Sequence, residues 1–246
     1  NKSKLANGVE LLVNSSTFGK AFVNRFDIVS GKERGKELKN LTELTLSGIL
    51  YYVSLVTNHL IEQGHFKKGF GKRNAVIIPE ILGWSKDPEI IDRLGKRKEE
   101  LYREMGKCEG IPILSGVKDL LKSLRDAGIP CVIGTSTEKK NVDLACAQHD
   151  LSAFFSGAVC TEDVTKGKPD PEVFLKAASL AGAEPQNCVV LEDSAHGIIA
   201  ARRGGMKGLG LATTRDRKDL LECGADMVVK DPTHVSIGLL ESLFQS

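Results

Sequence analysis

The chain lacks three features that would each indicate a particular class of protein. Its longest apolar-rich stretch, residues 47–61, contains Ser54, Asn58 and His59 and falls short of the ~20 residues that span a bilayer. Its formal net charge is only +2, whereas nucleic-acid-binding proteins usually carry a clustered excess of Lys and Arg. It also has no internal repeat. We therefore expect a soluble globular protein that binds neither membranes nor nucleic acids.

The six cysteines include no Cys-x-x-Cys pair. Three of them, Cys131, Cys160 and Cys188, lie in short apolar runs typical of buried strands. Reduced thiols in a cytosol-like compartment explain this distribution better than disulfides or a zinc site. No signal peptide is visible, but the chain begins without Met, as a fragment or a processed form would.

Short apolar strands alternate with helices from about residue 110 onward. We predict strands at 129–133, 157–160, 188–191, 207–212 and 227–229, and helices at 115–128 (with Ser115 as the N-cap), 138–147, 171–181 and 194–203. This alternation predicts an α/β fold, a doubly wound parallel sheet built from right-handed βαβ units. Ligands of such sheets bind outside the carboxyl ends of the strands.

The first 110 residues have a different character. Residues 38–62 and 86–105 are predicted to be mainly helical, although Gly95 interrupts the apolar stripe of the second helix. We therefore predict a small helical cap over residues 32–107, which could act as a lid. The α/β core would then comprise residues 1–31 and 108–246.

An acidic pair, Glu192 and Asp193, directly follows the predicted strand at 188–191. Carboxylates at a strand end suit a hard cation, and Mg²⁺ prefers a few carboxylate oxygens together with water and substrate phosphate. The alternative is an acidic helix N-terminus, which the helix macrodipole favours.

Two further segments bear on an anionic ligand. Lys168 precedes Pro169 and Pro171, which stiffen the backbone, and its ammonium could neutralise a phosphate or a carboxylate. The run from Gly134 to Thr137 follows the strand at 129–133, where hydroxyls and backbone N–H groups can hold a phosphate. The alternatives are a surface lysine in a turn and an ordinary helix N-cap.

Taken together and in this order, these segments resemble the haloacid dehalogenase-like (HAD) superfamily, most closely its β-phosphoglucomutase-like and small-phosphatase members. The resemblance covers residues 108–230 and rests on Pro112–Val117, Ala127–Pro130, Gly167–Pro171 and Leu191–Ser194. The segment Leu82–Pro88 is also similar to plant HAD-like proteins, some of them plastid phosphatases. That likeness implies the cytoplasm or the plastid stroma as the compartment.

The resemblance implies a Mg²⁺-dependent phosphatase or phosphomutase that acts on a small phosphorylated metabolite. Thr135 and Ser136 would bind the substrate phosphate, and Lys168 would steady both the nucleophile and the phosphoryl group. Asp193 would be a Mg²⁺ ligand, with Glu192 beside it, directly or through water. The cap would select the substrate.

The family's reaction begins at an aspartate nucleophile in a D-x-D motif at the end of the first strand, and it proceeds through an aspartyl-phosphate. No D-x-D occurs in this chain. The nearest candidate for the nucleophile, and for a further metal ligand, is Asp27, which apolar residues 21–23 precede. Val29, two residues on, cannot move a proton, and Asn24 and Arg25 suit a central buried strand poorly. The alternative for Asp27 is an ordinary surface carboxylate.

Three interpretations of this N-terminal segment are open. Asp27 is the nucleophile of a weakened enzyme, or the site is inactive and the chain binds or scaffolds protein partners, or the N-terminal sequence is not the natural one. Dehalogenation tolerates a non-acidic residue at the second position, but the acidic pair favours metal-assisted phosphoryl transfer, so dehalogenation ranks last.

Overall fold

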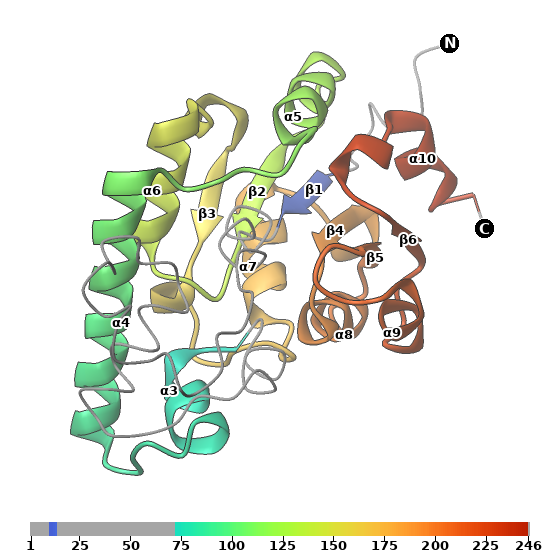
Figure 1. The fold of residues 1–246 in the computed structure, drawn as a ribbon. Coiled ribbons are helices and arrows are strands. Elements are labelled where there is room, and N and C mark those ends of the chain that lie inside the picture. The colour runs from blue at the N-terminus through green and yellow to red at the C-terminus, as the bar shows by residue number, and fades with distance from the viewer. Residues whose placement is uncertain (1–9, 14–71, 246) are drawn as a thin grey trace, which may run out of the picture.

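The computed structural model describes residues 10–13 and 72–245 of the chain (Figure 1). Asp27 and the helix predicted at 38–62 lie outside these residues. The described strands are β1 (Glu10–Val13), β2 (Cys131–Gly134), β3 (Gly157–Val159), β4 (Cys188–Glu192), β5 (Lys207–Leu211) and β6 (Met227–Val229). The main helices are α3 (Asn74–Val76), α4 (Pro88–Glu109), α5 (Val117–Asp126), α6 (Lys139–His149), α7 (Glu172–Ala181), α8 (Ala195–Arg203), α9 (Arg217–Glu222) and α10 (Ile237–Ser242).

The six strands form one sheet in the order β3-β2-β1-β4-β5-β6, and every neighbouring pair is parallel. After β1 the chain builds outward through β2 to β3, and it then crosses to β4 on the other side of β1 and builds outward to β6. The predicted doubly wound α/β fold is therefore confirmed. The reversal of strand order places the topological switch point beside β1, where ligands of such sheets bind.

Helices cover both faces of the sheet. Leu124 of α5 and Leu240 of α10 pack in one core with Leu191 of β4, whereas Phe174 of α7 and Val190 of β4 pack in a second core on the opposite face. Side chains of one strand alternate between the two faces, so β4 contributes to both cores. Its five residues are all buried, which explains why this strand is an unbroken apolar run before Glu192.

The location of the first strand differs from our expectation. The family resemblance places the nucleophile at the end of the first strand, so the choice of Asp27 implied a strand just before it, but the strand between β2 and β4 is Glu10–Val13. Residues 11–13 are continuously apolar, as a central parallel strand requires, whereas Asn24 and Arg25 interrupt the later segment.

The N-cap predicted for the helix after residue 115 is also wrong. Gly116, not Ser115, precedes the first turn of α5, and no side chain caps this end. Gly116 has φ 84° and packs directly on Thr233, where an added Cβ would lie 2.9 Å from the Thr233 backbone nitrogen. This left-handed conformation and close approach favour glycine.

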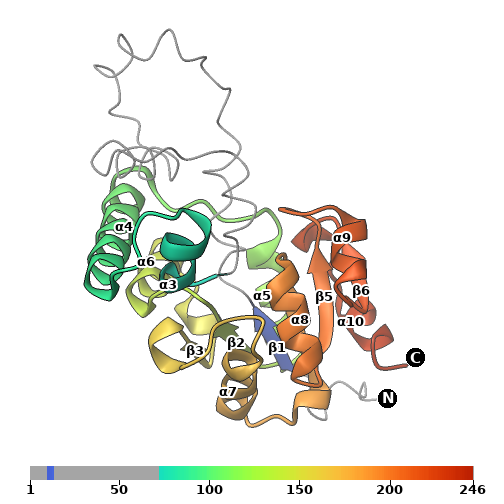
Figure 2. The same ribbon diagram turned by 90° about the horizontal axis from the view of Figure 1, so that it is seen from below.

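A layer of helices lies beside α6 (Figure 1). It consists of α3, the π-helical turn η5 (Ile77–Ile81) and α4, and both views place α3 and α4 next to each other (Figures 1 and 2). The predicted helix at 86–105 is confirmed and longer. Asp87 caps α4 by accepting from the backbone N–H of Glu89, and Gly95 lets α3 approach, because a Cβ there would lie 3.2 Å from that of Asn74.

No helix within residues 72–245 is long and apolar enough to cross a membrane. All six cysteines are free thiols, and four of them are buried. Burial raises the pKa of Cys131 to about 12, and burial together with the carboxylates of Glu162 and Asp163 raises that of Cys160 to about 12.

Candidate functional site

The carboxyl ends of β2 and β4 lie on either side of β1. Val13 of β1 pairs with Ile133 of β2 and with Leu191 of β4. Gly134 and Glu192 are thus each one residue past a partner of Val13 and end their strands at the same edge. The hydroxyl run that begins at Thr135 and the acidic pair therefore leave the sheet at its switch point.

Lys168 reaches this edge from the loop before α7. Its Nζ donates to Glu192 Oε2 at 2.9 Å and to the Gly134 carbonyl at 3.4 Å, and it lies 4.4 Å from the centroid of the Phe174 ring. The side chains of Lys168 and Glu192 are only 1% and 0% exposed. Lys168 is therefore not a surface lysine in a turn. It is a buried cation that bridges the ends of two strands.

Two glycines make room for this ion pair. A Cβ on Gly134 would lie 2.9 Å from Phe174 Cδ1, and one on Gly197 would overlap the Glu192 carboxylate. Gly134 therefore lets the Phe174 ring lie under the Lys168 ammonium. Gly197 lets the carboxylate of Glu192 fold back over the first turn of α8. The sequence alone did not reveal either role, although Gly197 belongs to the segment that follows the acidic pair.

The acidic pair is held by the start of α8 and by Thr214. Ser194 donates its backbone N–H to Glu192 Oε1 at 3.0 Å, and its hydroxyl caps α8 by accepting from Gly197 N–H at 3.0 Å. Thr214 donates its hydroxyl to the Asp193 carbonyl at 2.8 Å, and it lies 3.2 Å from Asp193 Oδ2. Both carboxylates are buried, so each relies on these partners.

The hydroxyl run forms a tight turn before α6. Thr135 is buried, and its Oγ1 accepts from the Thr137 N–H at 3.1 Å. The N-cap position of α6 is Glu138, and its side chain makes no capping hydrogen bond. The hydroxyl run from Thr135 to Thr137 therefore does not supply an ordinary N-cap. Asn141, which the sequence did not single out, donates to Thr137 Oγ1 at 2.9 Å and so holds the turn from α6.

A third titratable group lies close to the acidic pair in the sequence. His196, in the first turn of α8, is partly buried, and its Nδ1 has no hydrogen-bond partner among the described residues. Burial lowers the pKa of His196, and the positive charges of Lys72 and Arg215 lower it further. The cations Lys72 and Arg215 therefore act on His196 at the start of α8.

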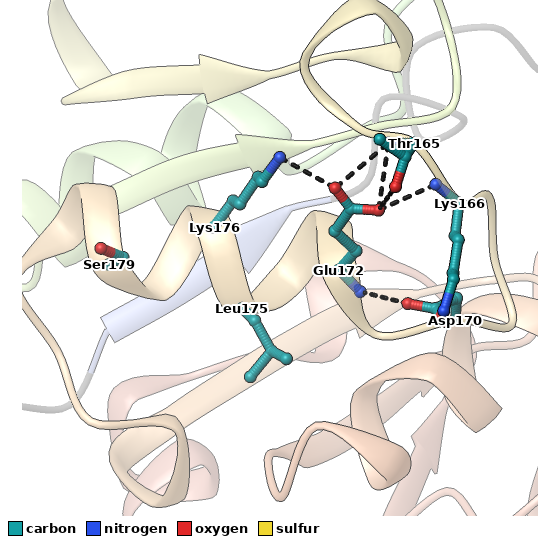
Figure 3. Close-up of a pocket in the computed structure, with 7 residues that line it drawn as sticks. All are labelled: Thr165, Lys166, Asp170, Glu172, Leu175, Lys176 and Ser179. Atoms are coloured by element: carbon teal, nitrogen blue, oxygen red, sulfur yellow. Dashed lines mark hydrogen bonds and ion pairs between the residues drawn. The ribbon is translucent and has the colours of Figure 1, made fainter.

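A hollow of about 510 Å³ lies away from this cluster, beside α7 and the loop before it (Figure 3). Glu172 occupies one wall and accepts from the Thr165 and Lys166 N–H groups, and Lys176 pairs with it at 2.8 Å. These polar groups bond to one another, so they are not free to bind a ligand. The hollow therefore lies along the outer side of the loop that carries Lys168. Lys168 itself does not line it.

The structure thus brings Lys168, Glu192 and the turn at Thr135 to one edge of the sheet, with Asp193 next to Glu192. It does not describe Asp27, which stays a prediction. Within residues 10–13 and 72–245, no three His, Cys, Asp or Glu side chains come close enough to form a metal site by themselves. Any metal held here would need further ligands from water, substrate or other parts of the chain.

Comparison with known proteins identifies the class. A model of haloacid dehalogenase-like hydrolases matches residues 23–205, well over half of the chain, so the chain belongs to this family. It is 34% identical over 175 residues to the chloroplastic 5-amino-6-(5-phospho-D-ribitylamino)uracil phosphatase of Arabidopsis thaliana, covering 70% of this chain and 46% of that protein. The chain thus spans less than half the length of this relative.

A second relative supports the same class, and a solved structure supports the fold. Hexitol phosphatase A of Escherichia coli is 32% identical over 183 residues, which cover 68% of this chain and 82% of that protein. The crystal structure of a β-phosphoglucomutase from Clostridium difficile shares the fold with a TM-score of 0.74 at 17% identity, covering 96% of each chain. The family and the subgroup suggested by the motifs are therefore confirmed.

Proposed function

We propose that the chain is a Mg²⁺-dependent phosphatase, or a phosphomutase-like enzyme, for a small phosphorylated metabolite. The observation that carries this proposal is the buried Lys168 ammonium, 2.9 Å from Glu192 and 3.4 Å from the Gly134 carbonyl, at the switch point of the sheet. A fixed cation at this edge can stabilise the charge of a phosphoryl group during its transfer. The named relatives are phosphatases, which supports the same class of reaction.

In this proposal, Asp27 is the nucleophile. One of its carboxylate oxygens would form a bond to phosphorus while the phosphorus–oxygen ester bond breaks, and the leaving alcohol would take up a proton from water. Water would then cleave the aspartyl-phosphate, which returns the carboxylate and releases inorganic phosphate. Thr135 and Ser136 would bind the phosphoryl oxygens, and Lys168 would neutralise their charge.

The donor set at the acidic pair fits a hard cation. Glu192 and Asp193 supply carboxylate oxygens, and Mg²⁺ commonly takes one or two carboxylates and completes its shell with water and phosphate. Asp193 would bind the ion, and Glu192, already paired with Lys168, would act beside it through water. When bound, Mg²⁺ would offset the negative charge of the phosphoryl group.

One observation favours a second candidate, a catalytically impaired HAD-like protein that binds or scaffolds protein partners. The family's nucleophile lies at the end of the first strand. Here that strand, β1, ends at Val13, and the next residue in the sequence is Asn14 rather than an aspartate. Asp27 lies fourteen residues beyond Val13 in the sequence and so does not directly follow β1. An amide in place of a carboxylate is a poor nucleophile, so such a chain would bind phosphate without turning over an ester.

The substrate and the compartment are further parts of the proposal. The plant relative acts on a phosphorylated ribitylamino-uracil and the bacterial one is named for hexitol phosphates, so we propose a phosphorylated polyol or sugar-like metabolite. The helices at 74–109 would belong to the cap that selects it. We propose the plastid stroma, because the plant relative is named as chloroplastic, with the cytoplasm as the alternative.

The test is hydrolysis of p-nitrophenyl phosphate in the presence of Mg²⁺. We expect turnover by the unmodified chain, its loss in Asp193→Asn, and no loss in the control Asp92→Asn, whose carboxylate pairs with Lys96 on the exposed face of α4. No turnover, or turnover that Asp193→Asn leaves unchanged, would contradict the proposal.

Two more variants separate the candidates for the nucleophile. If Asp27 is the nucleophile, Asp27→Asn abolishes turnover and Asn14→Asp adds nothing. If the site is impaired because Asn14 follows β1, the unmodified chain binds inorganic phosphate without turnover, and Asn14→Asp restores hydrolysis. Release of phosphate distinguishes these outcomes directly.

A further inference from the structure

Two adjacent residues at the start of α3, Arg73 and Asn74, connect this helix to both loops of the proposed site. Arg73 contacts the segment at 161–165, which leads into Lys168. Asn74 is linked through Glu99 and Asn141 to the hydroxyl turn after β2. The segment around α3 is far in the sequence from both loops, with Arg73 and Thr161 88 positions apart.

The guanidinium of Arg73 makes four hydrogen bonds to the segment before Lys168. Its Nε donates to Thr161 Oγ1 at 2.8 Å, and its Nη2 donates to the carbonyls of Thr161 at 2.7 Å and Val164 at 3.1 Å. Its Nη1 donates to the Thr165 carbonyl at 2.9 Å. Bonds from a charged, planar donor to several carbonyls fix both the position and the orientation of this segment.

Packing strengthens the same contact. A Cβ on Gly167 would lie 2.7 Å from Arg73 Cδ, so the backbone immediately before Lys168 packs on the Arg73 side chain. On its other side the loop is held by Glu172, which accepts from the N–H and hydroxyl of Thr165. The loop is therefore clamped between α3 and α7, and Lys168 leaves it with little freedom.

Two of the side chains in the contact through Asn74, those of Glu99 and Asn141, are buried. Asn74 Nδ2 donates to Glu99 Oε1 at 2.8 Å, and Asn141 Nδ2 donates to Glu99 Oε2 at 2.6 Å and to Thr137 Oγ1 at 2.9 Å. Burial by itself would raise the pKa of Glu99, but Lys98 and the two amides together lower it. Glu99 is therefore a charged, fully engaged link between α4 and the turn that contains Thr135.

A backbone hydrogen bond joins the two contacts. The Thr161 N–H donates to the Thr137 carbonyl at 3.0 Å, so the segment held by Arg73 and the turn held by Asn141 are joined directly. We propose that Arg73 and Asn74 are positioning residues, which hold the Lys168 loop and the hydroxyl turn at their working separation. Their role in phosphoryl transfer rests on the function proposed above. The hydrogen bonds by which Arg73 holds the segment at 161–165, here called the clamp, do not depend on that function.

Hydrogen exchange and steady-state kinetics of the full chain test this inference. We expect Arg73→Ala to speed amide exchange in peptides covering 161–168 by roughly tenfold, because the carbonyls lose their charged donor. Asn74→Ala should act on peptides covering 135–141 instead. Arg97→Ala is the matched control, since among the described residues its guanidinium bonds only to exposed Glu100 and Glu104 on α4. It should alter neither segment.

With p-nitrophenyl phosphate and Mg²⁺, Arg73→Ala should lower kcat by roughly ten- to a hundredfold, because a displaced cation stabilises the transition state less. KM should change less than about threefold. Arg73→Lys keeps the charge but cannot make four directed bonds, so it should restore kcat only in part. Gly167→Ala should act in the same direction by displacing Arg73, which covers the case in which Arg73→Ala folds poorly.

Unchanged exchange at 161–168 in both Arg73→Ala and Gly167→Ala would overturn the clamp. Faster exchange with an unaltered kcat would overturn its role in positioning. If the unmodified chain hydrolyses no aryl phosphate, the proposed function fails, and the exchange measurement alone then decides whether Arg73 holds the loop.

Discussion

The buried pair of Lys168 and Glu192 offers a quantitative test of the site. Their side chains are 1% and 0% exposed, and the charged atoms are 2.9 Å apart. At that separation the attraction is about 6 kcal/mol with an effective dielectric constant of about 20. Most of this attraction offsets the cost of removing both charges from water, so the pair adds little net stability. Removing one partner leaves the other charge buried and uncompensated.

We therefore expect Lys168→Met to lower the free energy of unfolding by about 3–5 kcal/mol, a large share of the roughly 5–15 kcal/mol typical of a domain. The double variant Lys168→Met/Glu192→Gln should be about 2 kcal/mol more stable than the single one, because its buried carboxylate is gone. Lys218→Met, which removes an exposed partner of Glu222, should cause no resolvable change.

Urea unfolding followed by circular dichroism measures all three variants under the same conditions. The reasoning is refuted if Lys168→Met costs less than about 1 kcal/mol, or if the double variant is less stable than the single one. Either result would mean that water reaches the pair and screens it.

Three further predictions concern neighbouring features. Gly197→Ala should destabilise the protein by about 1–3 kcal/mol, because its Cβ would overlap Glu192. In the control Gly238→Ala, also in the first turn of a helix, the added Cβ meets nothing within 4 Å, so this variant should be neutral or slightly stabilising. Equal unfolding midpoints in urea for the two variants would contradict this. The lowered pKa of His196 means that the unfolded chain takes up a proton at a higher pH than the folded one, so stability falls as pH drops below about 6.5. His196→Asn should therefore flatten the curve of unfolding midpoint against pH between about 7.5 and 5. An unchanged slope would argue against this role of His196. An aromatic disulfide reagent at about pH 8 should modify exposed Cys108 in the folded protein and the four buried thiols only after unfolding, and rapid reaction of a buried thiol would contradict the packing.

Much of the fold follows from local patterns in the sequence. Short apolar runs of three to six residues, separated by segments with helical periodicity, predicted β2 to β6 within a few residues, because buried parallel strands must be apolar on both faces. The acidic pair was found in the same way, since Glu192 and Asp193 directly end such a run. Lys168 stood out through Pro169 and Pro171, which mark a rigid loop.

The first strand shows where local patterns mislead. Residues 10–13 form only a short apolar run that contains Glu10, and the apolar residues 21–23 before Asp27 form a run of similar length, although Asn24 and Arg25 interrupt that segment. What selects Glu10–Val13 is its pairing with both β2 and β4, which are more than a hundred residues away in the sequence. Long-range pairing of this kind leaves no local signature.

By itself, the sequence determined the class of fold and which residue types stand at the carboxyl ends of the strands. Only the tertiary structure decided how they are joined, through the burial of Lys168 against Glu192, the space that Gly197 leaves for that carboxylate, and the contact of Arg73 with the loop at 161–165. The repeat of apolar residues along a helix or strand indicates which face of that element is buried, and it can be seen in the local sequence. Contacts between distant segments depend on the packing of the whole domain, and no run of neighbouring residues encodes them.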